Sequence, residues 1–216
     1  MKQGILFILS GPSGSGKTTL TKKLLESREL QGVLVKSVSA TTRGPRPGER
    51  HGQDYFYISE KMFRYKIRAG HFLEWENVFH SYYGTPRKNL FLNLRRGKSV
   101  ILCIDVKGAK TVARKFPKAC RIFIQPPSMA ILKKRLENRK SESSKEMTLR
   151  LKAARVEMKE TRFYDLVVIN DDLSAAYQFL VEFIRCKIND RDGSVSKGSR
   201  TGRWGAKNHF DKAVGM

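Results

Sequence analysis

A glycine-rich segment near the N-terminus holds the residues whose types and spacing most directly suggest chemistry. The segment consists of Gly11, Pro12, Ser13, Gly14, Ser15, Gly16, Lys17 and Thr18, and it follows the apolar run at residues 5–9. This order fits the G-x-x-x-x-G-K-[ST] phosphate-binding loop, whose backbone N–H groups point at phosphate oxygens and lead into a helix N-terminus. We expect Lys17 to neutralise the outer phosphates and the Thr18 hydroxyl to hold Mg²⁺. An ordinary glycine-rich turn is the alternative.

The rest of the chain alternates between stretches that predict strands and stretches that predict helices. Strands are predicted at residues 2–9, 35–42, 54–58, 72–79 with a continuation to 82–85, 99–105, 121–124 and 165–170, and helices at 17–28, 60–69, 86–96, 107–115, 129–139, around 149–154 and at 175–187. Ser128 is the expected N-cap of the helix that starts at residue 129. Unbroken apolar runs such as 99–105 indicate parallel strands covered on both faces. This pattern predicts an α/β fold with a doubly wound parallel sheet.

Short strands and a single helix in the first half of the chain indicate a small inserted subdomain. We expect a core at residues 2–36, 97–138 and 151–188, and an insert at 37–96 whose Pro- and Gly-rich loop carries Arg43 and Arg46. The polar, Ser-rich stretch 140–147 is expected to be mobile. Apolar periodicity is lost after residue 189, so 190–216 is expected to be a basic, disordered tail.

The charge of the chain points to anionic ligands. Its 216 residues include 43 Lys or Arg and 20 Asp or Glu, a formal net charge of +23. The last 27 residues hold six Lys or Arg against three Asp and so carry only +3 of it. No apolar run approaches eighteen residues, so we expect a cytoplasmic protein without a membrane span. The three dispersed cysteines, Cys103, Cys120 and Cys186, are expected to be reduced core residues rather than a metal or redox site.

A series of further motifs follows the phosphate loop along the chain. They are Ser37-Val38-Ser39-Ala40-Thr41-Thr42-Arg43 with Arg46, Gly48-Glu49, Gly52-Gln53-Asp54-Tyr55, Phe72-Leu73-Glu74-Trp75, Tyr82-Tyr83-Gly84-Thr85, Ile104-Asp105-Val106-Lys107-Gly108, Pro126-Pro127-Ser128 and Asn170-Asp171-Asp172. In order and spacing, this series resembles the guanylate kinase family of P-loop nucleoside monophosphate kinases over roughly residues 2–188. Many unrelated NTPases share the phosphate loop alone, so the whole series is the more specific signal.

The resemblance implies transfer of the γ-phosphoryl group of ATP to GMP, which gives ADP and GDP in purine nucleotide metabolism. The acceptor is a phosphate with a second pKa near 6, so its oxygen is already anionic at pH 7 and needs no side-chain base. The barrier is the approach of two polyanions, and the protein must supply positive charge and alignment. This explains why arginine, rather than histidine, dominates the motifs.

The resemblance also assigns roles to individual residues. It makes 37–96 the GMP-binding insert and 139–150 a helical lid, with Arg135, Arg139 and Arg150 as lid arginines that act with Lys17 on the phosphates. ATP would contact the phosphate loop (residues 11–18), Arg135 and Asn170, and Mg²⁺ would be held by Thr18 and, through water, by Asp105. The GMP site would comprise Ser39, Arg43, Arg46, Tyr55, Glu74, Tyr83, Thr85 and Arg150.

Glu74 is the implied guanine selector, because a carboxylate accepts hydrogen bonds from guanine N1–H and the exocyclic amine. Adenine lacks that pair of donors, and such a site can reject an analogue by about 10⁴-fold. Considered alone, Glu74 would be interpreted as a surface residue on an edge strand. Cys103 is a departure, since an acidic residue that helps to bind guanine often occupies this position in the family.

Three other functions remain as alternatives at this stage. The first is a non-catalytic scaffold of the same fold, although such scaffolds commonly lose the loop lysine or the lid arginines that this chain retains. The second is a kinase for another nucleotide, which Glu74 and Ser39 disfavour. The third is additional nucleic-acid binding, through the net charge and the tail residues Arg200, Arg203, Trp204, Lys207 and Lys212. The oligomeric state is left open.

Overall fold

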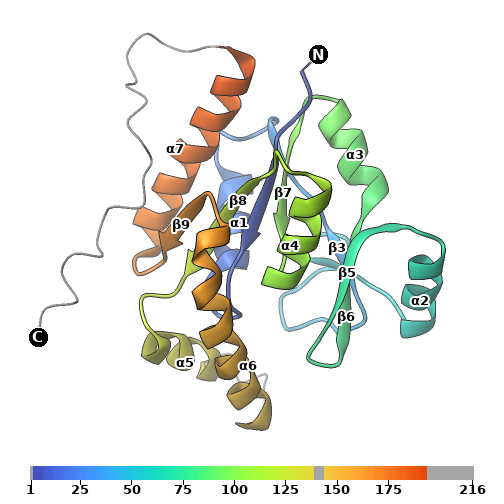
Figure 1. Ribbon diagram of the computed structural model, residues 1–216, viewed down its shortest axis with the longest axis vertical. Coiled ribbons are helices and arrows are strands. Elements are labelled where there is room, and N and C mark those ends of the chain that lie inside the picture. The colour runs from blue at the N-terminus through green and yellow to red at the C-terminus, as the bar shows by residue number, and fades with distance from the viewer. Residues whose placement is uncertain (1, 139–143, 194–216) are drawn as a thin grey trace, which may run out of the picture.

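A parallel five-stranded sheet forms the centre of the molecule (Figure 1). We describe it from a computed structural model, in which residues 2–138 and 144–193 are placed. The strands are β1 (Leu6–Ser10), β2 (Leu34–Lys36), β7 (Ser99–Cys103), β8 (Cys120–Gln125) and β9 (Leu166–Ile169), in the order β2-β7-β1-β8-β9. Every neighbouring pair is parallel. The predicted parallel sheet is confirmed.

Helices cover both faces of this sheet because its strands are apolar on both sides. Phe7 and Leu9 of β1 pack in one buried cluster with α1 (Lys17–Glu26) and α7 (Leu173–Asp192). Leu6 and Ile8 pack in a second cluster with α3 (Arg87–Arg95) and α4 (Val106–Lys115). Alternate side chains of one strand therefore anchor opposite layers, which is the doubly wound arrangement.

A second sheet of four short strands forms the inserted subdomain, which projects to one side of the core in Figure 1. Its strands are β3 (Ser39–Thr41), β4 (Tyr55–Tyr57), β5 (Phe72–Val78) and β6 (Ser81–Pro86), in the order β4-β3-β6-β5, with α2 (Glu60–Arg68) packed on them. A small cluster around Phe63, Phe72 and Ala40 joins helix and sheet.

The single strand predicted at 35–42 is wrong, because the chain divides it between the two sheets. Lys36 ends β2 in the core, the N–H of Ser37 still bonds to the carbonyl of Ile101, and Ser39 begins β3 in the insert. Both halves have extended backbone, so the alternation of side chains persists across the boundary. Alternation indicates strand conformation and carries no information about which sheet a strand joins.

The insert is also shorter than expected, because α3 belongs to the core. Leu90 and Leu94 are about 1% exposed and pack with Leu6, Ile8 and Val100 of the parallel sheet. The boundary expected at residue 96 therefore falls at Pro86, where β6 ends.

Helices α5 (Met129–Glu137) and α6 (Ser144–Glu157) pack against each other below the core sheet in Figure 1, and the 3-10 turn η1 (Met158–Phe163) returns the chain to β9. Leu132, Leu136 and Ala154 are buried between the two helices. The Ser128 hydroxyl accepts from the N–H of Ile131, which confirms the predicted N-cap. Residues 144–147 form the first turn of α6, so this part of the stretch expected to be mobile is helical. Arg139 lies outside the described residues.

The last helix is longer than predicted at both ends. The Asp172 carboxylate caps α7 by accepting from the N–H of Ala175, and the helix ends at Asp192 before Gly193, whose φ is 76°. Residues 190–192, which we expected in the tail, are therefore helical, and Arg191 donates to the carbonyl of Gly97. The rest of the predicted tail, 194–216, lies outside the described residues. Across the part of the chain that is described, we find no helix both long and apolar enough to cross a membrane.

The assignment of α3 to the core predicts a difference between two leucines on the same helix. Leu94→Ala should lower the free energy of unfolding by about 2–5 kcal/mol, because it leaves a cavity beneath a helix that covers the parallel sheet. Leu92→Ala, at a side chain that is 42% exposed, should change it by less than about 1 kcal/mol. Urea unfolding of both variants measures this, and equal losses would contradict the assignment.

Candidate functional site

The phosphate loop connects β1 to α1, and two of its glycines occupy positions that no other residue fits. Gly16 precedes α1 with φ 98°, and a Cβ there would lie 2.1 Å from Asn170 Nδ2. Gly11 has φ 137°, and a Cβ would lie 2.2 Å from the carbonyl oxygen of Ile124. At both glycines the backbone is in the left-handed region and a neighbouring atom lies too close for a Cβ, so two separate constraints exclude a side chain. The loop can therefore press against β8 and β9 while its N–H groups surround an anion.

The Lys17 ammonium is held over the loop by backbone oxygens. Its Nζ donates to the carbonyls of Gly11 at 2.6 Å and Pro12 at 2.8 Å. The loop itself is braced from β9, where Asn170 Nδ2 donates to the carbonyl of Ser15 at 2.8 Å, and the Asn170 carbonyl in turn accepts from Arg135 at 2.9 Å. The Lys17 ammonium therefore lies where the loop would bind phosphate oxygens.

One cleft joins the phosphate loop to the insert and to α6. The predicted residues that line it are Gly11, Ser13, Gly14, Gly16, Lys17, Thr18, Ser39, Arg43, Arg46, Tyr55, Glu74, Tyr83, Asp105 and Arg150. The cleft opens at the carboxyl ends of β1 and β7, where doubly wound sheets bind ligands. Residues from distant parts of the chain therefore converge on one site.

Arg43 and Arg46 lie on the insert side of this cleft in a preorganised cluster. Arg43 Nε donates to the Tyr83 hydroxyl at 3.2 Å, and its Nη2 forms an ion pair with Glu49 at 3.0 Å. Glu49 also accepts from the N–H of Arg46 at 2.8 Å. The Arg43 guanidinium lies 5.5 Å from the centre of the Tyr55 ring, within cation–π range. The Arg43 guanidinium and two tyrosines held together in this way, with Arg46 lining the same cleft, suit a phosphate dianion.

Glu74 is deeply buried, at 6% exposed, although it stands on the edge strand β5. Helix α4 covers that edge so closely that a Cβ on Gly108 would lie 3.0 Å from Glu74 Oε2. The Thr85 hydroxyl donates to Oε1. The pKa of Glu74 is raised to about 7: burial raises it most, the Thr85 hydrogen bond opposes this, and the charge of Asp105 adds to the rise. A surface position, the interpretation of Glu74 considered alone, is therefore wrong: Glu74 is a recessed acceptor in the cleft, which the buried Ser39 also lines.

The phosphate end of the cleft carries oxygen ligands of the kind that Mg²⁺ binds. Thr18 is exposed in the cleft, and Asp105 caps α4, its Oδ1 accepting from the N–H of Gly108 at 2.7 Å. Glu157 at the end of α6 lines the same space. Its pKa is raised, mainly by burial; the charge of Lys17 opposes this rise, and the charge of Asp105 adds to it. Among the described residues, no group of three or more His, Cys, Asp or Glu gathers into a ready metal site.

Comparison with known proteins identifies the family. The guanylate kinase family profile matches residues 3–187. A guanylate kinase from Caldanaerobacter subterraneus subsp. tengcongensis is 44% identical over 191 residues, covering 87% of this chain and 91% of the relative. One from Buchnera aphidicola subsp. Acyrthosiphon pisum is 45% identical over 184 residues, covering 85% and 88%. The chain belongs to the guanylate kinase family.

A solved structure agrees with this assignment. The crystal structure of guanylate kinase from Anaplasma phagocytophilum has a TM-score of 0.72 and 34% identity, covering 86% of this chain and 87% of that chain. The chain is accordingly an enzyme that transfers the γ-phosphoryl group of ATP to GMP, giving ADP and GDP, and the expectation made from its motifs is confirmed.

Some predicted site residues do not line the cleft themselves. Thr85 acts through Glu74, and Pro12 and Ser15 contribute backbone carbonyls to Lys17 and Asn170. Asn170 is 3% exposed and braces the loop from behind, and Arg135 contacts Asn170. The contacts of Asn170 and Arg135 with ATP remain predictions, as does any role of Arg139.

The sequence analysis gave no role to three residues that line the cleft or hold a residue that lines it. Glu49 is the carboxylate that orients Arg43, and its place in a loop with two arginines was an available signal. Glu157 follows Arg150 by seven residues on one helix, a spacing that puts both on the same face. Phe79 lies at the tip of the β5–β6 hairpin and lines the cleft, and nothing in its local pattern indicated this.

The raised pKa of Glu74 predicts how the stability of the ligand-free enzyme depends on pH. The carboxyl ionises near 4.5 when unfolded and near 7 when folded, so its contribution is fully present below about pH 4.5 and is lost as pH rises through 7. The loss should reach up to about 3 kcal/mol. Glu74→Gln, which does not ionise, should flatten the decline between pH 5 and 8 in urea unfolding. Glu60→Gln, at a side chain 55% exposed, is the control, and parallel profiles for wild type and Glu74→Gln would refute the prediction.

Proposed function

We propose that the cleft holds GMP against the insert and ATP against the phosphate loop, so that the two meet beside Arg150. The observation that carries this is the burial of Glu74, which lines the insert side of the cleft with Ser39 and accepts from Thr85, while Lys17 lines the cleft from the phosphate loop. A carboxylate kept from water there loses the free energy of its hydration, and only hydrogen bonds that it accepts from other groups compensate for this loss. Guanine offers two donors in the required arrangement, so this end of the cleft suits the base.

The arginine cluster supports the second half of the proposal. Arg43, Arg46, Tyr55 and Tyr83 would hold the phosphate of GMP, whose oxygen attacks the γ-phosphorus of ATP without a side-chain base. Lys17 and the lid arginines Arg135, Arg139 and Arg150 would neutralise the charge that two polyanions bring together. Arginines in this role are worth roughly 10³-fold or more in rate. The cations and their alignment are therefore the catalytic machinery.

Mg²⁺ fits the phosphate end of the cleft. Thr18 and Asp105 both line it, and hydroxyl, carboxylate and water oxygens are the ligands that Mg²⁺ prefers. Bound with ATP, the ion would neutralise part of the charge of the phosphates. Thr18 would hold it directly and Asp105 through water.

The remaining proposals concern partners and location. Because its substrates are nucleotides of the cell interior, we place the enzyme in the cytoplasm. The scaffold alternative is disfavoured by the presence of Lys17 and Arg150 in the cleft. The basic residues proposed for nucleic-acid binding in the tail lie outside the described residues, and the oligomeric state stays open.

The substrate assignment is tested by ADP release with Mg-ATP and, in turn, GMP, AMP, CMP and UMP. We expect turnover with GMP at least about 10³-fold above that with the other three, because only guanine satisfies Glu74. Comparable turnover with AMP would refute guanine selection by Glu74. A folded sample that binds GMP and turns over none of the four would instead support the scaffold.

The role of Lys17 is tested by a substitution that separates catalysis from binding. Lys17→Ala should reduce turnover by roughly 10³-fold or more while GMP affinity, measured by calorimetry, changes little, because the residues proposed to hold GMP belong to the insert and not to the phosphate loop. Lys22→Ala, at an exposed side chain five residues later on the same helix, is the matched control and should retain activity. Equal losses of turnover and GMP affinity in Lys17→Ala would mean that the substitution damaged the fold.

A further inference from the structure

One arginine touches all three parts of the molecule. Arg150 belongs to α6, its Nη1 donates to the Ser13 hydroxyl of the phosphate loop at 3.2 Å, and its guanidinium carbon lies 4.4 Å from the centre of the Phe79 ring. Phe79 belongs to the insert, at the tip of the β5–β6 hairpin, which approaches α6 in Figure 1. The Phe79–Arg150 contact therefore connects the insert to α6 across the cleft.

The turn that carries Phe79 is one that a bulky side chain does not favour. Val78 pairs with Ser81, and the two residues between them, Phe79 and His80, have φ values of 49° and 64°. Two-residue hairpins with positive φ at both positions prefer asparagine, aspartate or glycine. Turn propensity therefore does not account for phenylalanine at position 79.

Core packing does not account for it either. Phe79 is half-buried and lines the cleft with Arg150, Ala153 and Glu157. It belongs to none of the hydrophobic clusters formed by the described residues, whereas its neighbour Tyr82 packs on Phe63 with 5.4 Å between the ring centres. The side chain is placed toward the guanidinium rather than toward a core.

The chemistry of the contact suits a group that must act on phosphates. Stacking on an aromatic ring engages the face of a guanidinium, so the N–H donors at its edge keep their capacity to bind oxygen. The attraction strengthens when water is excluded, as it would be with both nucleotides in the cleft. An aliphatic side chain of similar size would fill the space without orienting the charge.

We propose that Phe79 is a positioning residue that holds Arg150 in the cleft and couples binding of GMP on the insert to binding of ATP on the loop. The inference rests on the proposed function, since it takes the insert as the GMP side. GMP bound to the insert would fix the hairpin and so hold the ring in its contact with Arg150, and the guanidinium would then be presented to the phosphates of both nucleotides. GMP should therefore increase the affinity for an ATP analogue, and that increase should depend on the ring.

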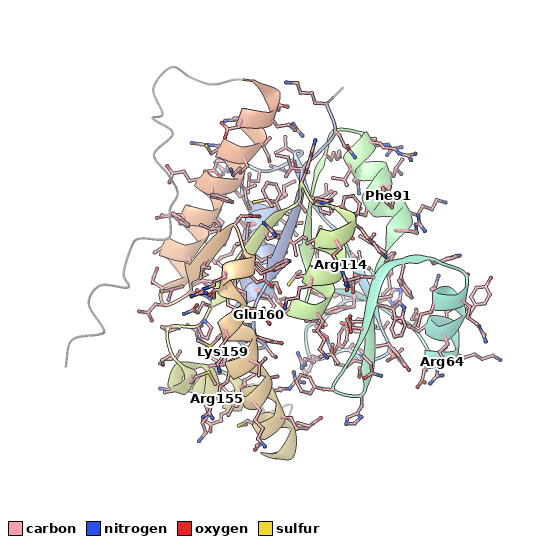
Figure 2. All side chains as sticks on the ribbon, viewed as in Figure 1. Arg64, Phe91, Arg114, Arg155, Lys159 and Glu160 are labelled. Carbon is pink, nitrogen blue, oxygen red and sulfur yellow. The ribbon has the colours of Figure 1, made fainter. Side chains whose placement is uncertain are left out.

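The test compares Phe79→Leu and Phe79→Tyr, the latter keeping an aromatic face. Phe79→Leu should lower kcat by roughly 5- to 10-fold, the range expected for loss of a partly desolvated cation–π contact, with the KM for GMP changed less than about 2-fold. Phe79→Tyr should retain activity within about 2-fold. Phe91→Leu is the matched control: Phe91 also lies under an arginine, Arg87 at 5.7 Å, and Figure 2 shows it on α3, away from α6.

A double-mutant cycle with Arg150→Ala separates positioning from a general structural effect. In the Arg150→Ala background, Phe79→Leu should cost less than about 2-fold in kcat, because the group it orients is gone. If the losses of kcat from the two substitutions simply multiply in the double variant, the proposal is overturned. It is also overturned if Phe79→Tyr lowers kcat as much as Phe79→Leu does while its melting temperature is unchanged.

The coupling itself is measured by calorimetry, without turnover. Affinity for Mg²⁺ with a non-hydrolysable ATP analogue is determined with and without GMP in wild type, Phe79→Leu and Phe91→Leu. We expect GMP to raise it in wild type and Phe91→Leu, and the enhancement to fall toward 1 in Phe79→Leu. An undiminished enhancement in Phe79→Leu, or none in wild type, would overturn the coupling. Failure of GMP to bind at all would instead contradict the proposed function.

Discussion

Repulsion between two sets of phosphates is the constraint on which the rest of this structure depends. Bringing a monophosphate dianion against the γ-phosphate of ATP is unfavourable unless cations stand on both sides of the contact. The protein supplies these cations from three separate parts of the chain: Lys17 from the loop, Arg43 and Arg46 from the insert, and Arg150 from α6. Each of the three parts must therefore be positioned by the core sheet, and none would form the site alone.

Cations that face one another across one cleft also need partners within the protein. Lys17 is held by the carbonyls of Gly11 and Pro12, Arg43 by Glu49 and Tyr83, and Arg150 by Ser13 and Phe79. Among these partners only Glu49 carries a negative charge, and the others are neutral. They orient the cations without neutralising the site as a whole. Phosphate oxygens can then replace the neutral acceptors at little cost, because a charge-assisted hydrogen bond is stronger than the one it displaces.

The sequence was most informative where a motif and its structural context are local. The phosphate loop, the N-cap at Ser128 and the apolar strands of the parallel sheet all depend on neighbours within a few residues, and all were predictable. The partition of 35–42 between two sheets, the packing of α3 on the core and the burial of Glu74 under α4 depend on contacts between distant elements. Local periodicity carries no information about these contacts. Phe79 is the clearest example, because Arg150, which it contacts, lies 71 residues away along the chain and because the turn that holds Phe79 favours other residue types.

The account's central claim, that these cations are stationed for phosphates, is tested most directly by a crystal structure with GMP, Mg²⁺ and a non-hydrolysable ATP analogue bound together. We predict that the Lys17 ammonium leaves the Gly11 and Pro12 carbonyls for phosphate oxygens, and that Arg150 leaves Ser13 to contact phosphate while Phe79 stays against it. Guanine should lie against Glu74. Nucleotides bound with Lys17 and Arg150 still on their present oxygen partners, and no phosphate within hydrogen-bond distance of either, would contradict the account.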